Sequence, residues 1–365
     1  MTGFAEWKAG DFTEWEKSGA GLNPAGEMVL DFSTAVTETD PYGAGGYYGG
    51  NFYNGGSYLV GEVISPEFTA EFNFGELIVS WNAGTPLGTW VEILASVKMG
   101  ERWTKWYNLG VWASDTGTIQ RHSVKLQGDS DGYVAVDTLV LTDKKAIGQT
   151  YQLKVRLFST IETATPSVRY LSAAYSTSTP KKITASVGNQ GSWNNLINVP
   201  ECSQMVYPDG GNVWCSPTSV SMVLGYWGAD PGPCEPRVRN AVAGVYDWIY
   251  DGHGNWVFNT AYAGSLGFTA SVRRFASLND VEPWVARDVP VVFSFAWGKN
   301  DLTGAAIDSS NGHLAVIVGL DDAGNPIVND PAAALDEDVQ RTYNRAELEA
   351  VWLTNSGGTV YIIEP

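Results

Sequence analysis

The sequence predicts two domains of different class, an all-β domain over residues 1–185 and an α+β domain over residues 186–365. Up to about residue 176, strand-like segments follow one another with no helical pattern between them. Beyond about residue 200, helical patterns come first and strand patterns follow. With 365 residues, 44% of them hydrophobic, the chain is long enough for each domain to bury a core of its own.

Period-2 alternation is the main strand signal in the first domain. Tyr151, Leu153, Val155 and Leu157 alternate with polar residues, as in a strand with one buried face. Turn clusters rich in Gly, Asn, Asp and Pro separate such runs. This succession of short strands and turns predicts a jelly-roll-like β-sandwich. The other expected strands are Tyr58–Ile64, Leu77–Trp81, Val91–Val97, Lys105–Ala113, Tyr133–Leu141 and Val168–Tyr175.

Residues 177–200 have the composition of a linker that runs into the second domain. The expected helices of that domain are Pro217–Trp227, Pro236–Tyr250, Val257–Gly264, a segment near Asn279–Arg287 and Arg345–Leu353. The expected strands are Thr269–Phe275, Val291–Ala296, His313–Leu320, Pro326–Asn329 and Thr359–Ile363. The cluster Asp321-Asp322-Ala323-Gly324 predicts a hairpin turn between the third and fourth of these strands.

The net charge of −18 disfavours nucleic acid and anionic membranes as partners, because like charges repel at range. No apolar run reaches the roughly 18–20 residues of a membrane helix. The segment Met1–Trp7 does not have the pattern of a signal peptide, so the chain is either cytosolic or a mature protein without its leader. Abundant aromatic residues, little lysine and the acidic balance favour an extracellular location.

The three cysteines all lie between residues 202 and 234. An odd number in an exported protein predicts one disulfide and one free thiol. A Cys202–Cys234 pair would leave Cys215 free; the alternative is three reduced cysteines. No spacing typical of a zinc site occurs, so we expect neither a metal nor another cofactor.

Cys215 precedes Ser216-Pro217, and proline is favoured in the first turn of a helix. A thiol at a helix N-terminus faces the positive end of the helix dipole, which favours the nucleophilic thiolate. The alternative is a buried structural cysteine.

His313 opens the apolar run Leu314–Val318, whose strand would hold the imidazole rigidly as a general base and acid. The alternative is a structural histidine at the strand end. His122 and His253 are expected to be surface or loop residues, so His313 is the candidate base.

Asp330 follows His313 by 17 residues, where a hairpin would return the chain beside the histidine. Its carboxylate would then orient the imidazole. Asn329 is the alternative, although alternation places only one of the two on that side, and Asn329-Asp330-Pro331 also fits a simple turn. Gln204, just upstream of Cys215, is the candidate side-chain donor to an oxyanion.

These pieces, in this order, resemble the C39-like (C39_2) papain-fold cysteine peptidases of secreted bacterial proteins over residues 195–365. The resembling segments are Val199-Pro200, Ser203-Gln204, Trp214–Ser219, Gly254–Trp256, Asn311–Leu314 and Val328–Pro331. The resemblance implies a thiol protease with the triad Cys215, His313 and Asp330 and with Gln204 in the oxyanion hole. Residues 1–185 show no such resemblance.

The implied activity is hydrolysis of peptide or amide bonds through a thiolate acyl-enzyme intermediate. A close variant transfers the acyl group to an amine. A different class of function is binding: the aromatic, glycine-rich loop 41–53 could form a glycan platform on the sandwich, lie over the catalytic cleft as a lid, or be a long loop pinned by its aromatic residues. The papain-like domain would in that class be a pseudoenzyme within a protein-docking or cell-surface module.

Overall fold

The computed structural model describes residues 1–142, 148–177, 179–229 and 231–365. The chain forms two compact units. The sandwich unit consists of residues 3–177 and 246–265, and the second unit of residues 1–2, 178–245 and 266–365. The boundary predicted at residues 185/186 stays a prediction.

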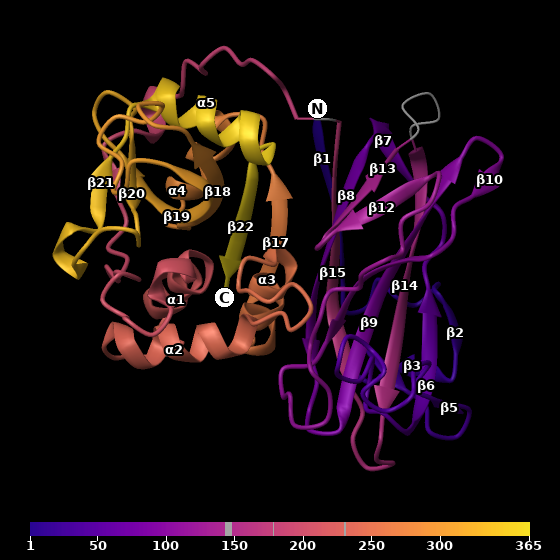
Figure 1. Ribbon diagram of the computed structural model, residues 1–365. Coiled ribbons are helices and arrows are strands. Elements are labelled where there is room, and N and C mark those ends of the chain that lie inside the picture. The colour runs from indigo at the N-terminus through magenta and orange to yellow at the C-terminus, as the bar shows by residue number, and fades with distance from the viewer. Residues whose placement is uncertain (143–147, 178, 230) are drawn as a thin grey trace. The chain divides into compact units, whose positions relative to one another are not determined.

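The sandwich unit contains two antiparallel sheets (Figure 1). The first sheet contains β1 (Thr2–Lys8), β3 (Ala20–Leu22), β4 (Met28–Leu30), β8 (Glu76–Gly84), β12 (Gly132–Ala135), β13 (Thr138–Leu141) and β15 (Ser167–Ser176). The second contains β2 (Glu16–Ser18), β5 (Val36–Thr39), β6 (Ser57–Ile64), β7 (Phe68–Phe74), β9 (Thr89–Met99), β10 (Arg102–Trp103), β11 (Tyr107–Trp112) and β14 (Gly148–Ser159).

The period-2 pattern of β14 predicts its burial correctly. Tyr151, Leu153, Val155 and Leu157 are buried, whereas the polar residues between them are half-buried. The all-β class of the N-terminal region is therefore confirmed. The single strand predicted over Tyr133–Leu141 is wrong, because β12 and β13 pair as a hairpin whose turn holds Val136 at a φ of 61°.

Residues 246–265 complete the sandwich unit although they follow two helices of the other unit. In α3 (Trp256–Ser265), the buried ring of Phe258 packs edge-on against Trp112 and Trp81. The predicted helix Pro236–Tyr250 is wrong at its C-terminal end, since α2 spans Cys234–Val245. The carboxylate of Asp247 accepts hydrogen bonds from the backbone N–H groups of Ile249 and Tyr250 and thereby holds a turn.

The aromatic loop 41–53 is pinned to the sandwich. Tyr47, Phe52 and Tyr53 are buried, and the Tyr53 ring packs 5.7 Å from that of Trp90. Of the loop's large aromatic side chains, only Tyr42 and Tyr48 are exposed within the described residues. The buried rings make the loop an extension of the hydrophobic core.

The second unit has one antiparallel sheet with helices around it (Figure 1). Its strands are β16 (Asn195–Leu196), β17 (Thr269–Arg274), β18 (Val291–Trp297), β19 (Ser310–Leu320), β20 (Pro326–Asn329), β21 (Gln340–Thr342) and β22 (Thr359–Glu364). Its α-helices are α1 (Cys215–Tyr226), α2, α4 (Glu282–Val285) and α5 (Arg345–Ser356). Short 3-10 helices are η1 (Gln190–Ser192), η2 (Gly211–Val213), η3 (Leu278–Asp280) and η4 (Asp336–Asp338).

The α+β class of this part is confirmed, and β19 and β20 form the predicted hairpin, with Val316 opposite Asn329. The helix predicted near Asn279–Arg287 is split into η3 and α4. The Ser277 hydroxyl and the Asp280 carboxylate form a capping box there.

Part of the predicted linker is anchored within the second unit. Ser178 lies outside the described residues. From Ser186 onward, buried charged groups hold the segment: the backbone N–H of Ser186 donates to Glu349, and the indole N–H of Trp193 donates to Glu282. Arg345 pairs with Glu282 at 2.8 Å. These contacts fix the chain before it enters the sheet at β16.

Candidate active site

Cys215 is the first residue of α1 and is half-buried. Helix geometry leaves the N–H groups of its first turn without intrahelical acceptors, so they point toward the thiol end of the helix. The helix is tied to β19 because the Ser219 hydroxyl donates to the carbonyl of Leu314 at 3.1 Å. This bond brings the N-terminal part of α1 next to the residue that follows His313.

His313 lies near the start of β19 and is almost completely buried. The rings of Phe295 and Trp297, both on β18, pack edge-on against the imidazole with centroids at 5.3 and 5.6 Å. Their packing excludes water from two sides of the ring. The imidazole Nε2 lies 2.7 Å from Asp330 Oδ1.

Asp330 directly follows β20 and is fully buried. Besides the imidazole, its Oδ1 accepts a hydrogen bond from the backbone N–H of Ala332 at 2.9 Å, and its Oδ2 accepts one from the Tyr343 hydroxyl at 2.6 Å. Burial by itself raises the pKa of Asp330, but the charge of His313 and these hydrogen bonds lower it below its ordinary value. The carboxylate is therefore ionised at neutral pH.

The pKa of His313 is raised to about 10. Burial lowers it, but the charge of Asp330, its hydrogen bond and an interaction with Cys215 outweigh that effect. Since Nε2 is bonded to Asp330, the nitrogen that faces Cys215 is Nδ1. The arrangement can hold a thiolate beside an imidazolium, the form of the pair that attacks a carbonyl.

Gln204 is buried against the turn that leads into α1. Its Nε2 donates to the carbonyl of Gly211 at 2.7 Å, which leaves one N–H of the amide, and its backbone N–H donates to the carbonyl of Pro331 at 2.8 Å. A side chain at residue 211 would not fit, since a Cβ there would lie 1.9 Å from the carbonyl oxygen of Gln204. Gln204 thus contacts both the turn before Cys215 and the residue after Asp330.

The structure brings Cys215, His313 and Asp330 together, with Gln204 beside them. The alternative Asn329 lies on the other side of its strand, where its amide donates to the carbonyl of Val199 at 3.2 Å. The expectation that His122 is a surface or loop residue is right in that it lies in the segment between β11 and β12, but it is not at the surface. It is fully buried in the sandwich unit, where its ring nitrogens lie 2.7 and 2.9 Å from the carbonyls of Phe52 and Ser123.

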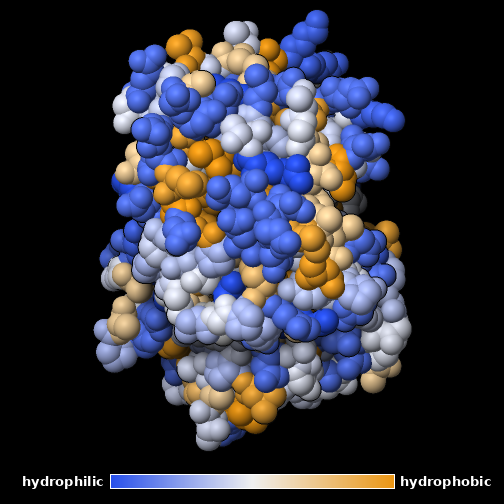
Figure 2. Space-filling view, turned by 90° about the vertical axis from the view of Figure 1, so that its left-hand side faces the viewer, coloured by the Kyte–Doolittle hydropathy of each residue, from blue (hydrophilic) through white to orange (hydrophobic). Residues whose placement is uncertain are grey.

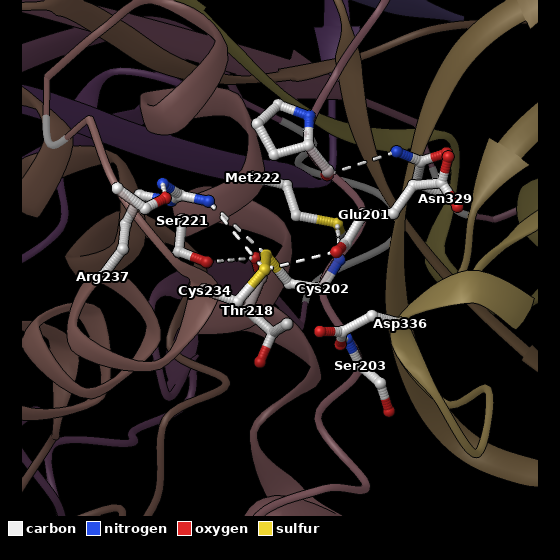
Figure 3. The surroundings of a disulfide bond; sticks show 12 residues. Glu201, Cys202, Ser203, Thr218, Ser221, Met222, Cys234, Arg237, Asn329 and Asp336 are labelled. Carbon is white, nitrogen blue, oxygen red and sulfur yellow. Dashed lines mark hydrogen bonds between the residues drawn. A yellow bond between two sulfur atoms is a disulfide. The ribbon is translucent and has the colours of Figure 1, made fainter.

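A disulfide joins Cys202 and Cys234, and Cys215 is free. Figure 3 shows the bridge between the segment before Gln204 and the start of α2, with the guanidinium of Arg237 beside its sulfur atoms. The bridge therefore attaches the segment before Gln204 to the first residue of α2.

Three residues around the site, Tyr343, Phe295 and Trp297, are not predicted from the sequence. Phe295 lies directly opposite His313 in the pairing of β18 with β19. The strand pattern of β18 would therefore predict the contact of its two rings with His313 only if this pairing were already known. Tyr343 has no local signal that links it to Asp330. In the described part of the chain, no group of three or more His, Cys, Asp or Glu side chains could hold a metal ion.

The described helices include none with the length and hydrophobicity of a membrane span. The face seen in Figure 2, to which β20 and β21 belong, carries hydrophobic side chains in separate patches among hydrophilic ones.

Two family models match the chain, the peptidase C39 N-terminal domain over residues 3–176 and the peptidase C39-like family over residues 196–360. The first match gives a family for the sandwich, for which the sequence shows no resemblance above. No curated protein matches the chain.

Among solved structures, the chain is similar to a "putative C39-like peptidase" from Bacillus anthracis, with 18% identity, a TM-score of 0.34, and coverage of 47% of this chain and 98% of that one. A Stig cyclase, Fisc, from Fischerella sp. TAU is 12% identical with a TM-score of 0.20, over 46% of this chain and 87% of that one. Similarities this weak support no conclusion about function. The family matches place residues 196–360 in the peptidase C39-like family, behind a peptidase C39 N-terminal domain.

Proposed function

We propose that this protein is an extracellular cysteine hydrolase that cleaves peptide or amide bonds, with Cys215 as nucleophile, His313 as general base and acid, Asp330 as the residue that orients His313, and Gln204 in the oxyanion hole. The observation that carries the proposal is a free, half-buried thiol at a helix N-terminus that interacts with a buried His–Asp pair. Membership in a peptidase family supports a peptide as substrate.

The reaction begins when the Cys215 thiolate attacks the carbonyl carbon and the π electrons move onto the oxygen. The backbone N–H of Cys215 and the remaining amide N–H of Gln204 stabilise that oxyanion. His313 then gives its proton to the leaving amine as the C–N bond breaks, which leaves a thioester. Water, deprotonated by His313, attacks the thioester, and the acid leaves as the thiolate forms again.

The test is a digest of a peptide library by the parent and by Cys215→Ala, followed by mass spectrometry. We expect cleavage by the parent alone, with uptake of one ¹⁸O atom from labelled water at each new carboxyl terminus. Products joined to an added amine in place of water would show acyl transfer. A library left intact by the parent at every pH from 5 to 9 would contradict the proposal.

The disulfide supports an oxidising compartment, since such bonds rarely persist in a reducing cytosol. The glycan-binding alternative gains no support from loop 41–53, whose aromatic rings are mostly buried.

Exposed apolar side chains next to the site favour a substrate with a bulky apolar residue near the scissile bond. Met205 and Val206 follow Gln204, Val213 precedes Trp214-Cys215, and they are 44%, 42% and 59% exposed. The two segments lie together, because Gly211 and Tyr207 are joined by a backbone hydrogen bond of 3.0 Å. Apolar groups exposed side by side gain free energy when a ligand covers them.

We therefore expect Val213→Asp to lower kcat/KM for apolar peptides at least tenfold, the order of one lost apolar contact plus one buried charge. The matched control is Leu196→Asp in β16, where the side chain is 53% exposed. Leu196 pairs with Gly319, near the end of β19, whereas His313 lies near the start of that strand. Cleavage-site profiles of the two variants measure the difference. Equal losses in both variants would rule out a substrate contact at Val213.

A further inference from the structure

The carboxylate of Asp330 has three hydrogen-bond donors, which come from three different segments of the second unit. Oδ1 faces His313 on β19 and the backbone N–H of Ala332, and Oδ2 accepts from Tyr343 at 2.6 Å. The Tyr343 hydroxyl is the sole side-chain donor to Oδ2 among the described residues. The orientation of the carboxyl plane is thus defined from both of its oxygens.

Tyr343 is itself held firmly. It lies between β21 and α5 and is 1% exposed, and its backbone N–H donates to the carbonyl of Pro326 at 3.0 Å. The next residue, Asn344, caps α5 by accepting hydrogen bonds from the N–H groups of Ala346 and Glu347. The ring therefore projects from a junction that is fixed on both sides.

The hydroxyl proton of Tyr343 is directed at Asp330. The phenol oxygen has a hydrogen bond with the backbone of Ala306, in the loop before His313. The ionised Asp330 offers no proton, so the phenol donates to it. Burial and the charge of Asp330 raise the pKa of Tyr343, so the phenol keeps this proton at every pH at which the protein is handled.

We propose that Tyr343 is a positioning residue of the site, whose hydroxyl holds the Asp330 carboxylate ionised and turned toward His313. The proposal rests on the roles proposed above for Cys215 and His313. A charge-assisted hydrogen bond to a buried carboxylate stabilises the charged form more than a neutral bond would. The same carboxylate then stabilises the imidazolium that faces the thiol.

Among the described residues, few charged or titratable groups lie around Asp330. His313 faces it from β19, Tyr343 faces it from the β21–α5 junction, Cys215 acts on it through His313, and Arg341 of β21 acts on Tyr343. Of the hydrogen bonds to Asp330, Tyr343→Phe removes only that from Tyr343. It keeps the ring, and it also removes the bond between the phenol oxygen and the backbone of Ala306. We expect that change to raise the pH at which Asp330 is protonated by roughly one unit, the order of one lost charge-assisted hydrogen bond.

Two pH titrations of the full chain measure this shift in the parent and in Tyr343→Phe. One is the rate of iodoacetamide alkylation at Cys215, whose acid limb is expected to move to higher pH by that unit. The other is the NMR signal of the His313 imidazole, whose acid transition reports protonation of Asp330 without any use of the thiol.

Tyr53→Phe is the matched control. It removes the same kind of bond, from a buried tyrosine hydroxyl to the buried carboxylate of Glu92 at 2.8 Å, in the sandwich unit. The control is expected to lose stability and to leave both titrations within about 0.2 unit of the parent, on a scale where one unit is tenfold. A His313 titration in Tyr343→Phe that coincides with that of the parent or of Tyr53→Phe overturns the proposal. If alkylation of the parent is indifferent to His313, the proposed function fails, and the NMR titration still decides the role of Tyr343.

Discussion

Replacement of His313 with alanine is expected to change the shape of the pH profile of Cys215 alkylation. In the parent, the rate should be nearly constant from about pH 6 to 9, because the neighbouring imidazolium keeps the thiol ionised. An ordinary cysteine thiol is only about 3% ionised at pH 7, so the rate in His313→Ala should rise almost tenfold per pH unit between 6 and 8. Peptide mapping by mass spectrometry gives the rate at Cys215 itself.

The pKa of His313, which is raised to about 10, also makes the stability of the protein depend on pH. A raised pKa means that the proton on the ring stabilises the fold fully below its ordinary value of about 6.5, and that this contribution is lost as the pH rises through 10. The lowered pKa of Asp330 acts at the other end, where stability is lost as the pH falls below about 4. Stability should therefore fall above pH 9, whereas the alkylation rate should not, because the thiol stays ionised when the imidazolium loses its proton.

His122→Ala is a suitable control, since His122 is a buried histidine of the sandwich unit. Its profile should coincide with that of the parent. A parent profile that already rises tenfold per unit, and that does not change in His313→Ala, would exclude a thiolate–imidazolium pair and with it the proposed mechanism.

Removal of the Cys202–Cys234 disulfide is expected to lower the free energy of unfolding by about 3–4 kcal/mol. The bridge closes a loop with a sequence separation of 32 residues, and closing a loop of that length removes roughly this much entropy from the unfolded chain. Urea unfolding of Cys202→Ala/Cys234→Ala, followed by tryptophan fluorescence, measures the loss.

Cys215→Ala is the matched control for this change, because it removes a cysteine that is in no disulfide. It should unfold within about 1 kcal/mol of the parent, as expected for a half-buried side chain of this size. Below its unfolding transition, the double variant should keep the alkylation profile of the parent. A changed profile would mean that the bridge also positions the residues of the site.

The sequence predicts the candidate site better than it predicts its surroundings. Cys215 begins a helix, His313 lies near the start of a strand and Asp330 directly follows one. Turn residues and apolar runs leave a clear local signal at such places, and the hairpin from β19 to β20 fixes the distance between His313 and Asp330. Tyr343 has no such signal, because its bond to Asp330 depends on where β21 ends and α5 begins.

In the fold, too, features set by neighbouring residues are predicted correctly, whereas a feature set by residues distant in the sequence is not. Alternation predicts β14 correctly, since each side chain meets one face of the sheet. The end of α2 is predicted wrongly, because it depends on Asp247, whose carboxylate also accepts from the backbone N–H of Ser123. That partner is 124 residues away in the chain, beyond the reach of any local pattern.

The excursion of residues 246–265 into the sandwich unit has a consequence for biosynthesis. A ribosome releases the strands of the sandwich first, and domains usually fold in that order. Here the rings of Trp81 and Trp112 can pack against Phe258 only after α1 and α2 have also been synthesised. The nascent sandwich must therefore wait, with apolar surface uncovered, until part of the peptidase region has emerged.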